Sequence, residues 1–123
     1  MVLHAADAQQ GRSQAVSLDA TLAALADGTR RGVVDLLRKS PRRASDLADA
    51  LGASKPAMSR HLRVLRDSGL VETSSKDDGR ERIYTLRPAP FAQLRAWIED
   101  IEAFWTVQLA SFKDHVERTR GKR

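Results

Sequence analysis

Cationic and polar side chains gather on one side of a helix predicted over residues 54–68. At about 100° per residue, with Ser59 at zero, they fall within an arc from about −40° to +60°, and Arg60 lies at its edge. The residues in this arc are Lys55, Pro56, Ser59, Arg63 and Arg66. A helix that aims four cations outward from one face has the chemistry to enter the major groove of DNA and to bind its phosphates.

The opposite side of this helix is apolar, which predicts that it packs on a core. Ser54 is placed to cap the first turn, and Gly69 follows the last turn. The residues on the apolar side are Met58, His61, Leu62, Val64 and Leu65. We expect His61 to pack against the preceding helix and to bond a backbone carbonyl.

A short helix, a turn and the cationic helix together predict a helix-turn-helix over residues 45–68. Ser45 is the expected cap of the short helix, and Leu47, Ala48 and Leu51 form its apolar face. Gly52 comes next, and glycine supplies the permissive backbone that the turn requires.

Beyond Gly69 the sequence predicts a β-hairpin. Residues 70–73 and 82–86 have the pattern of strands, and residues 76–80 between them are turn formers, with Gly79 suited to a positive φ. A hairpin directly behind a helix-turn-helix makes a winged helix. The expected fold is therefore mainly α with a small β-hairpin, a winged helix-turn-helix of five helices plus a two-stranded wing.

The remaining helices lie before and after this unit. Apolar residues over 18–25 predict a first helix, and Asp27 is placed to cap a second. Pro88 and Pro90 are expected to separate the wing from a final helix, whose apolar residues recur at spacings of three and four over 91–116. About 28 helical residues would be about 42 Å long. A domain of this size cannot cover such a helix, so it needs a partner surface, and a second copy of the chain is the simplest one.

Length and composition fit a single basic domain. The chain has 123 residues, a formal net charge of +5 and no cysteine, which suits a polyanionic partner and excludes a disulfide or a thiolate metal site. We expect a disordered segment over residues 1–15, a DNA-binding and dimerisation domain over 16–119, and a basic tail over 120–123. No stretch reads as a signal sequence or a membrane span, so a cytoplasmic location is expected.

Three stretches together resemble the ArsR/SmtB family of bacterial winged-helix repressors. They are ALADGTRRGVVDLL (24–37), SDLADALGASKPAMSRHLRVLRDSGLV (45–71) and GRERIYTL (79–86). The resemblance covers about residues 18–118, with the order and spacing of the elements intact. It implies a homodimer built on the first and last helices, which binds an imperfect inverted repeat in a promoter and leaves it when an effector binds. One departure is Gly28, where the family usually has proline at the start of the second helix.

The resemblance also implies where the contacts lie. The expected DNA-binding residues, on the cationic helix and the wing, are Ser54, Lys55, Pro56, Ser59, Arg60, Arg63, Lys76, Arg80 and Arg82. The expected dimer-interface residues, on the two terminal helices, are Leu18, Leu22, Trp97, Ile101, Phe104, Trp105 and Phe112.

We expect no metal site and no cofactor. Metal sensors of this family often carry paired cysteines on the third helix, where this chain has residues 43–46 without a cysteine. A four-ligand pattern on the family's last helix is matched here only by Glu102 and His115, because Phe104 and Arg118 occupy the other positions, and two ligands are too few for a tight zinc site. The Phe-Trp pair on this helix resembles the metal-independent branch of the family, whose effector is often unknown.

Two hypotheses from different classes follow. The leading one is a dimeric DNA-binding transcriptional repressor that is released by a small-molecule effector other than a metal. The alternative is a winged helix used as a protein-interaction module, with the aromatic C-terminal helix as its working surface. An enzyme is not expected, because the histidines are far apart in sequence and no nucleophile elbow or phosphate-binding glycine motif occurs.

Overall fold

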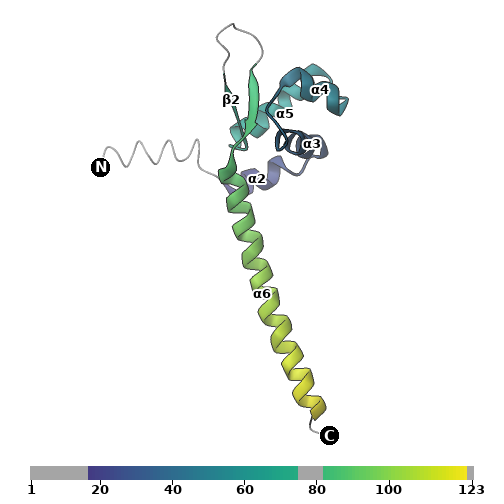
Figure 1. Ribbon diagram of the computed structural model, residues 1–123, viewed down its shortest axis with the longest axis vertical. Helices are drawn as coiled ribbons and strands as arrows, with labels where there is room; N and C mark the ends of the chain where they lie inside the picture. Colours follow the sequence, from purple (N-terminus) through teal and green to yellow (C-terminus); the bar gives the residue numbers. More distant parts are fainter. Residues whose placement is uncertain (1–16, 75–81, 122–123) are drawn as a thin grey trace, which may run out of the picture.

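The computed structural model describes residues 17–74 and 82–121, and these form five helices and a three-stranded sheet (Figure 1). The elements run in the order α2 (Leu18–Ala24), α3 (Gly28–Leu37), β1 (Arg42–Arg43), α4 (Ala44–Leu51), α5 (Lys55–Asp67), β2 (Val71–Ser74), β3 (Ile83–Leu86) and α6 (Pro88–Gly121). The predicted winged helix-turn-helix is confirmed. The segment expected to be disordered, residues 1–15, lies outside the described residues. So do residues 122–123, the last two of the expected basic tail.

Side-chain caps begin the first two helices, and the one at Asp27 is the cap that the sequence predicts. The Ser17 hydroxyl accepts a hydrogen bond from the Ala20 N–H at 3.2 Å, and the Asp27 carboxylate accepts one from the Arg30 N–H at 3.0 Å. Each bond satisfies one of the N–H groups that a helix leaves free in its first turn.

The cap predicted for α4 is wrong. The N-cap of this helix is Arg43, without a side-chain cap bond, rather than Ser45. The physical reason is the strand in front of it: Arg42 and Arg43 pair with Tyr84 and Ile83, so the chain passes directly from the sheet into the helix. The same pairing makes the sheet three-stranded, in the order β1-β3-β2, where the sequence predicted two strands. A strand of two residues is too short to show an alternating pattern.

A single apolar core joins the helices to the sheet. Its largest fully buried members are Val33, Leu47, Met58, Leu62, Leu65, Leu70 and Val71, contributed by α3, α4, α5 and the start of β2. The sequence placed Val64 among the core residues, and this is wrong, since its side chain is 39% exposed. It lies beside Ala20 and Ala23 of α2 in an open groove between α2 and α5.

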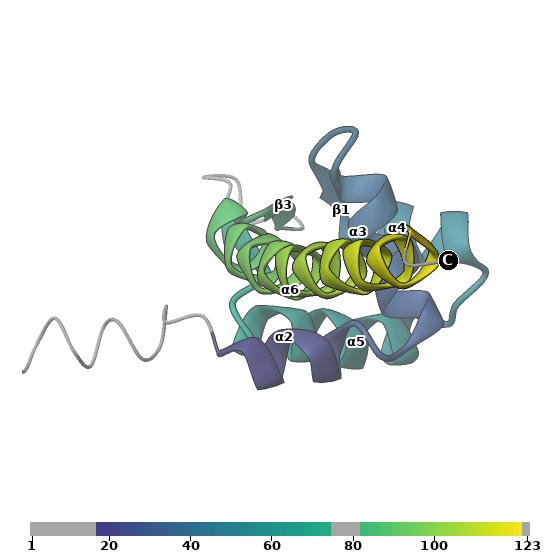
Figure 2. The ribbon, with the colours of Figure 1, turned by 90° about the horizontal axis from the view of Figure 1, so that it is seen from below.

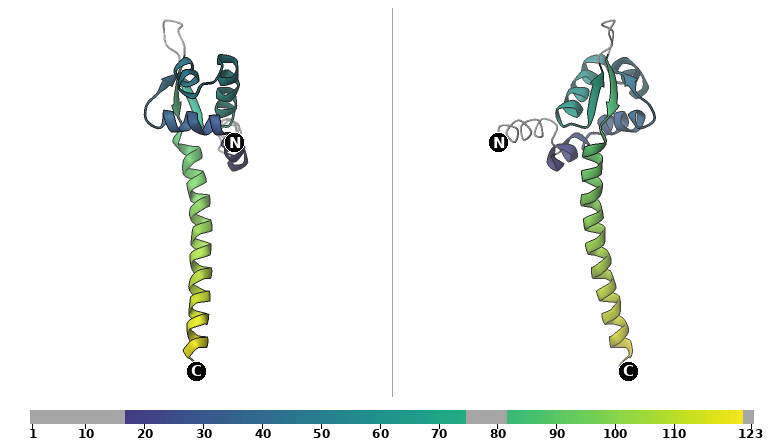
Figure 3. Two further views of the ribbon diagram at one scale, coloured as in Figure 1. Left: turned by 90° about the vertical axis from the view of Figure 1, so that its right-hand side faces the viewer. Right: turned by 60° about the vertical axis from the view of Figure 1, so that its left-hand side comes forward.

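Helix α6 leaves this body beside α2 and extends away from it as an isolated rod (Figures 1 and 3). Its 34 residues make it about 51 Å long. The sequence separated Pro88 and Pro90 from this helix, but both lie in its first turn, where a missing N–H costs no intrahelical bond. The helix also continues to Gly121, so the first two residues of the expected tail are helical.

Two glycines, Gly52 after α4 and Gly28 at the start of α3, allow a test of the left-handed turn. Gly52 has a φ of +64°, which costs an L side chain about 1–2 kcal/mol, whereas Gly28 has no positive φ and a methyl group there meets only the Arg31 side chain, at 3.7 Å. Gly52→Ala should therefore lower the free energy of unfolding by about 1–2 kcal/mol, and Gly28→Ala should leave it unchanged or raise it by up to about 1 kcal/mol. Urea unfolding at matched protein concentration measures both, and equal stabilities would contradict the left-handed turn.

Candidate nucleic-acid interface

The turn between α4 and α5 sets the position of the cationic helix. Gly52 adopts the left-handed conformation, and the Ala53 N–H donates to the Ala48 carbonyl at 3.0 Å, which closes the end of α4. Helix α5 begins two residues later. The Ser54 hydroxyl accepts a hydrogen bond from the Ala57 N–H at 3.2 Å, and Pro56 lies in the first turn, where proline is tolerated.

Three buried side chains fix the rotation of α5 about its own axis. Met58 is 1% exposed, Leu62 2% and Leu65 0%. Because these residues face the core, the opposite face must turn to the solvent. The exposed residues on that face and its edge are Ser54, Lys55, Pro56, Ser59, Arg60 and Arg63.

The cations on this exposed face are free to meet an anionic partner. Within the part of the chain that the structure describes, Lys55, Arg60 and Arg63 form no ion pair. None of the carboxylates that the structure describes therefore pairs with them, whereas the Nε of Arg87 lies 3.9 Å from a Glu72 carboxylate oxygen.

The wing meets the start of α5. Tyr84 of β3 and Lys55 and Ser59 of α5 line a cavity of about 190 Å³, together with the first residues of α4. Arg82 is exposed and directly precedes β3, on the side of the predicted wing loop. Lys76 and Arg80, the other two wing residues predicted to bind DNA, lie outside the described residues.

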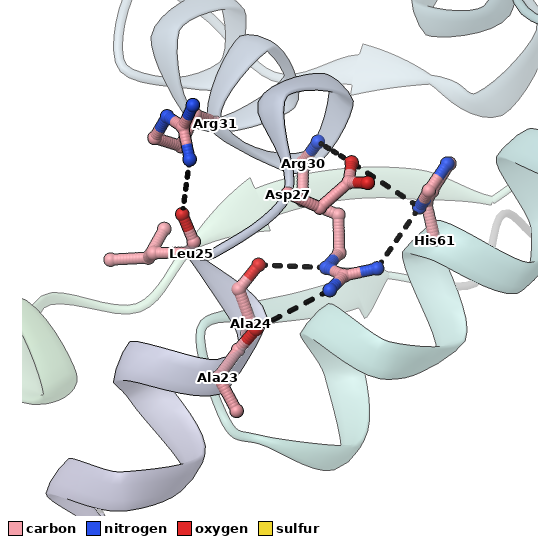
Figure 4. Close-up of polar contacts among 7 residues, drawn as sticks. All are labelled: Ala23, Ala24, Leu25, Asp27, Arg30, Arg31 and His61. Atoms are coloured by element: carbon pink, nitrogen blue, oxygen red, sulfur yellow. Dashed lines mark hydrogen bonds and ion pairs between the residues drawn. The ribbon is translucent and has the colours of Figure 1, made fainter.

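A polar cluster behind α5 was not found from the sequence (Figure 4). The Arg30 guanidinium donates from Nε to the Ala24 carbonyl at 2.7 Å and from Nη2 to the Ala23 carbonyl at 3.3 Å, and its Nη1 lies 3.2 Å from Nδ1 of His61. The same imidazole nitrogen is 3.8 Å from a carboxylate oxygen of Asp27. The expectation that His61 bonds a backbone carbonyl is thus wrong, because its partners are the side chains of Arg30, on α3, and of Asp27, the N-cap of that helix.

The N–H of Arg30 also acts on the carboxyl group in this cluster. By donating to the Asp27 carboxylate it lowers the pKa of Asp27 below its usual range, and the charge of the Arg30 guanidinium acts in the same direction. The 31-residue separation of Arg30 and His61 explains why periodicity gave no signal for the pair. The sequence singled out Asp27 as a helix cap and His61 as a core-side residue, but it did not connect either of them with Arg30.

The residues predicted to form a dimer interface lie on α2 and α6. Leu18 is half-buried and Leu22 is 39% exposed. The five on α6, which are Trp97, Ile101, Phe104, Trp105 and Phe112, are exposed by 38% to 67%. Phe104 and Trp105 stack edge to face, with ring centroids 6.4 Å apart. An apolar surface of this extent marks a site of association.

The described residues, 17–74 and 82–121, contain no group of three or more His, Cys, Asp or Glu side chains that could hold a metal ion. Glu102 and His115 are thirteen positions apart on α6, about 20 Å along its axis, so one subunit cannot bring both to one ion. None of the described helices is long and apolar enough to cross a membrane.

A helix-turn-helix with an exposed cationic second helix and an adjoining β-wing defines the winged-helix class of DNA-binding proteins. Residues 27–73 match the model of the bacterial regulatory proteins of the arsR family. The helix-turn-helix-type transcriptional regulator Rv2034 of Mycobacterium tuberculosis is 39% identical over 101 residues, which are 82% of this chain and 90% of that protein. The chain therefore belongs to the ArsR family, and it is a DNA-binding transcriptional regulator.

Solved structures of the family have the same architecture. An ArsR-like transcriptional regulator from Rhodococcus sp. RHA1 is 35% identical and superposes with a TM-score of 0.70, over 81% of this chain and 90% of that one. The winged helix-turn-helix domain of Mb0332 from Mycobacterium bovis, described as homodimeric, is 27% identical with a TM-score of 0.56, over 70% of this chain and 78% of that one.

The cap of the cationic helix gives a test of how α5 is held. Ser54→Ala removes the acceptor for the Ala57 N–H and should lower the free energy of unfolding by about 1 kcal/mol, whereas Ser54→Asp restores an acceptor and should recover it. Ser59→Ala is the matched control, since Ser59 is exposed on the same helix and forms no capping bond. Chemical denaturation followed by circular dichroism measures all three, and an equal loss in Ser59→Ala would show that the cap is not the cause.

Proposed function

We propose that this protein is a homodimeric transcriptional repressor that binds an inverted repeat in promoter DNA and is released by a small-molecule effector other than a metal ion. Each subunit would insert α5 into a major groove and lay its wing on the flanking minor groove. The DNA contacts would come from the residues predicted on α5, from Arg82, and from Lys76 and Arg80 of the wing loop.

The observation that carries the proposal is the free cationic face of α5. Burial of Met58, Leu62 and Leu65 turns Lys55, Arg60 and Arg63 outward, and these cations have no ion-pair partner among the described residues. A guanidinium in the major groove can bond both acceptors of a guanine, and any of the three can neutralise a phosphate.

The exposed stripe on α6 supports the dimer. At about 100° per residue with Trp97 at zero, its apolar residues occupy an arc from about −20° to 120°. They are Trp97, Ile98, Ile101, Phe104, Trp105, Leu109 and Phe112. Several hundred Å² of exposed apolar surface, at about 25 cal/mol per Å², would make a monomer costly and prone to aggregate. A second copy covers the stripe with an equally apolar one, and the M. bovis relative is described as homodimeric.

The chemistry of the chain supports an effector other than a metal. The full sequence has no cysteine, and the positions of α6 where metal-binding relatives carry ligands include Phe104 and Arg118. An effector would act by changing the relative placement of the two recognition helices, which is a coupling free energy between two sites.

The alternative function, a protein-interaction module that uses α6, predicts a different response to salt. A protein that neutralises several phosphates releases their counterions, so its affinity for a duplex must fall steeply as salt is added, whereas apolar docking on α6 need not respond. Fluorescence anisotropy with a labelled duplex, selected by the protein from a random pool, measures this slope. A flat response would favour the interaction module.

Arg63→Ala should weaken binding to the selected duplex by about 1–3 kcal/mol if the guanidinium reads a guanine, and by less if it meets a phosphate alone. Folding should not change, since Arg63 lies on the exposed face of α5. Arg118→Ala, which removes the same charge from the exposed far end of α6, is the matched control and should bind as the wild type does. Wild-type affinity in a folded Arg63→Ala protein would refute the assignment of this face.

Trp105→Glu should abolish dimerisation and operator binding together, because it places a charge within the apolar stripe. A dimer sets its two recognition helices about 34 Å apart, one turn of DNA, so a monomer loses one half-site. Val107→Glu is the control: Val107 is 61% exposed against 58% for Trp105, but it lies at about −80° on the helix, outside the stripe. Sedimentation and DNA binding test both variants. A Trp105→Glu monomer that binds the full operator with wild-type affinity would contradict the link between dimerisation and operator binding.

A further inference from the structure

Arg30 joins three helices at a single guanidinium (Figure 4). It belongs to α3, it donates to the carbonyls of Ala23 and Ala24 at the C-terminal end of α2, and it contacts His61 of α5. The last carbonyls of a helix have no intrahelical partner, and a cation suits the negative end of the helix dipole, so Arg30 serves as the cap of α2. The recognition helix is thereby tied to the end of α2 through one side chain.

A hydrogen bond between Arg30 and His61 requires one particular protonation state of the imidazole. Arginine carries only donors, so at 3.2 Å from Nη1 the Nδ1 atom of His61 must be the acceptor. This hydrogen bond therefore requires a neutral ring that carries its hydrogen on Nε2. A proton added to Nδ1 would set two donors against each other and place two positive charges at contact distance.

Asp27 offers the protonated ring another partner. Its carboxylate oxygen is 3.8 Å from the same Nδ1 atom, and the lowered pKa of Asp27 keeps it ionised well below neutral pH. A protonated imidazole can thus give up its contact with the Arg30 guanidinium, which is a donor, and form one with the Asp27 carboxylate, which is an acceptor. An imidazole is the side chain whose ordinary titration falls between about pH 5 and pH 8.

The other charged groups around this cluster are engaged elsewhere or exposed. On α3, the Arg31 guanidinium donates to the Leu25 carbonyl at 2.7 Å. The charged residue of α2, Asp19, is exposed, as are Asp46 and Asp49 of α4 and Glu72 of β2. On α5 itself, Arg60 and Asp67 flank the histidine at exposed positions, and Asp67 lines the groove between α2 and α5 with Arg30.

We propose that Arg30 and His61 form a positioning pair that holds the recognition helix against α2, and that a proton on His61 releases it. The inference rests on the proposed function and names a regulation of the same DNA-binding surface. Helix α2 packs on α6, and it lies with α5 on one side of that helix (Figure 2). A chain of contacts therefore runs from α6 through α2 and the Arg30–His61 pair to α5.

The sign of the effect distinguishes this device from ordinary electrostatics. A protonated histidine adds positive charge, which by itself would tighten binding to DNA. Release of α5 from α2 acts in the opposite direction, because the DNA-competent arrangement requires the neutral ring. Affinity for the selected duplex should thus fall by about fivefold or more between about pH 7.5 and pH 5.5.

The test compares the three histidines of the chain, each replaced by asparagine. In His61→Asn the amide oxygen keeps an acceptor near the position of Nδ1 and cannot be protonated, so binding should be close to wild type at pH 7.5 and independent of pH. His115→Asn and His4→Asn should retain the wild-type dependence. Arg30→Lys keeps the charge but cannot reach three acceptors at once, so it should bind more weakly at pH 7.5 and lose most of the pH dependence.

Anisotropy titrations with the labelled duplex at each pH, with thermal unfolding to confirm that each variant is folded, give the outcome. The positioning pair is overturned if the wild type binds the duplex at pH 7.5 and loses no affinity at pH 5.5. It is also overturned if His61→Asn loses as much affinity as the wild type does. Either result leaves the proposed function intact. Failure of the wild type to bind any duplex at pH 7.5 overturns both. If His61→Asn does not fold, persistence of the full pH dependence in Arg30→Lys overturns the pair in its place.

Discussion

The burial of three side chains on one face of α5 determines what the rest of this protein can do. Met58, Leu62 and Leu65 are almost completely enclosed, and a helix has only one rotation that encloses all three. That rotation directs the cationic face to the solvent. The energy that holds the DNA-binding surface in place is therefore hydrophobic, while the chemistry of the surface is electrostatic, and the two depend on different residues of the same thirteen-residue helix.

The sequence predicted the parts of the structure that follow local rules. The period of α5, its cap at Ser54 and the left-handed Gly52 each depend on residues a few positions apart, and all are as expected. The site residues on α5 also lie on the predicted face. Strand β1 and the Arg30–His61 contact were missed because both depend on residues that meet only after folding. Ser45 failed as a cap for the same reason, since pairing with β3 starts α4 earlier than local propensity would.

The proposed activities of the molecule are divided between its ends, and the contact of α2 with α5 between them includes the hydrogen bonds of Arg30. The apolar core takes most of its buried side chains from α3, α4, α5 and the start of β2 and one, Ala24, from α2, and α2 also meets α5 across an open groove and through the fork of Arg30. A packed core resists small displacements, but a few hydrogen bonds can be exchanged at modest cost. Movement of α2 relative to α5 is thus the cheaper deformation, and it is the one that would connect a change at α6 with the DNA-binding surface.

The length of α6 has a mechanical consequence. A straight helix of 34 residues is about 51 Å long, so a tilt of about 5° where it leaves the body moves its far end by about 4 Å, more than the diameter of a water molecule. Conversely, a partner that binds the C-terminal end of α6 acts on the winged domain from a distance of about 51 Å. A binding partner there can turn the domain with small forces, and thermal bending of the rod limits how accurately two domains can be aligned on one stretch of DNA.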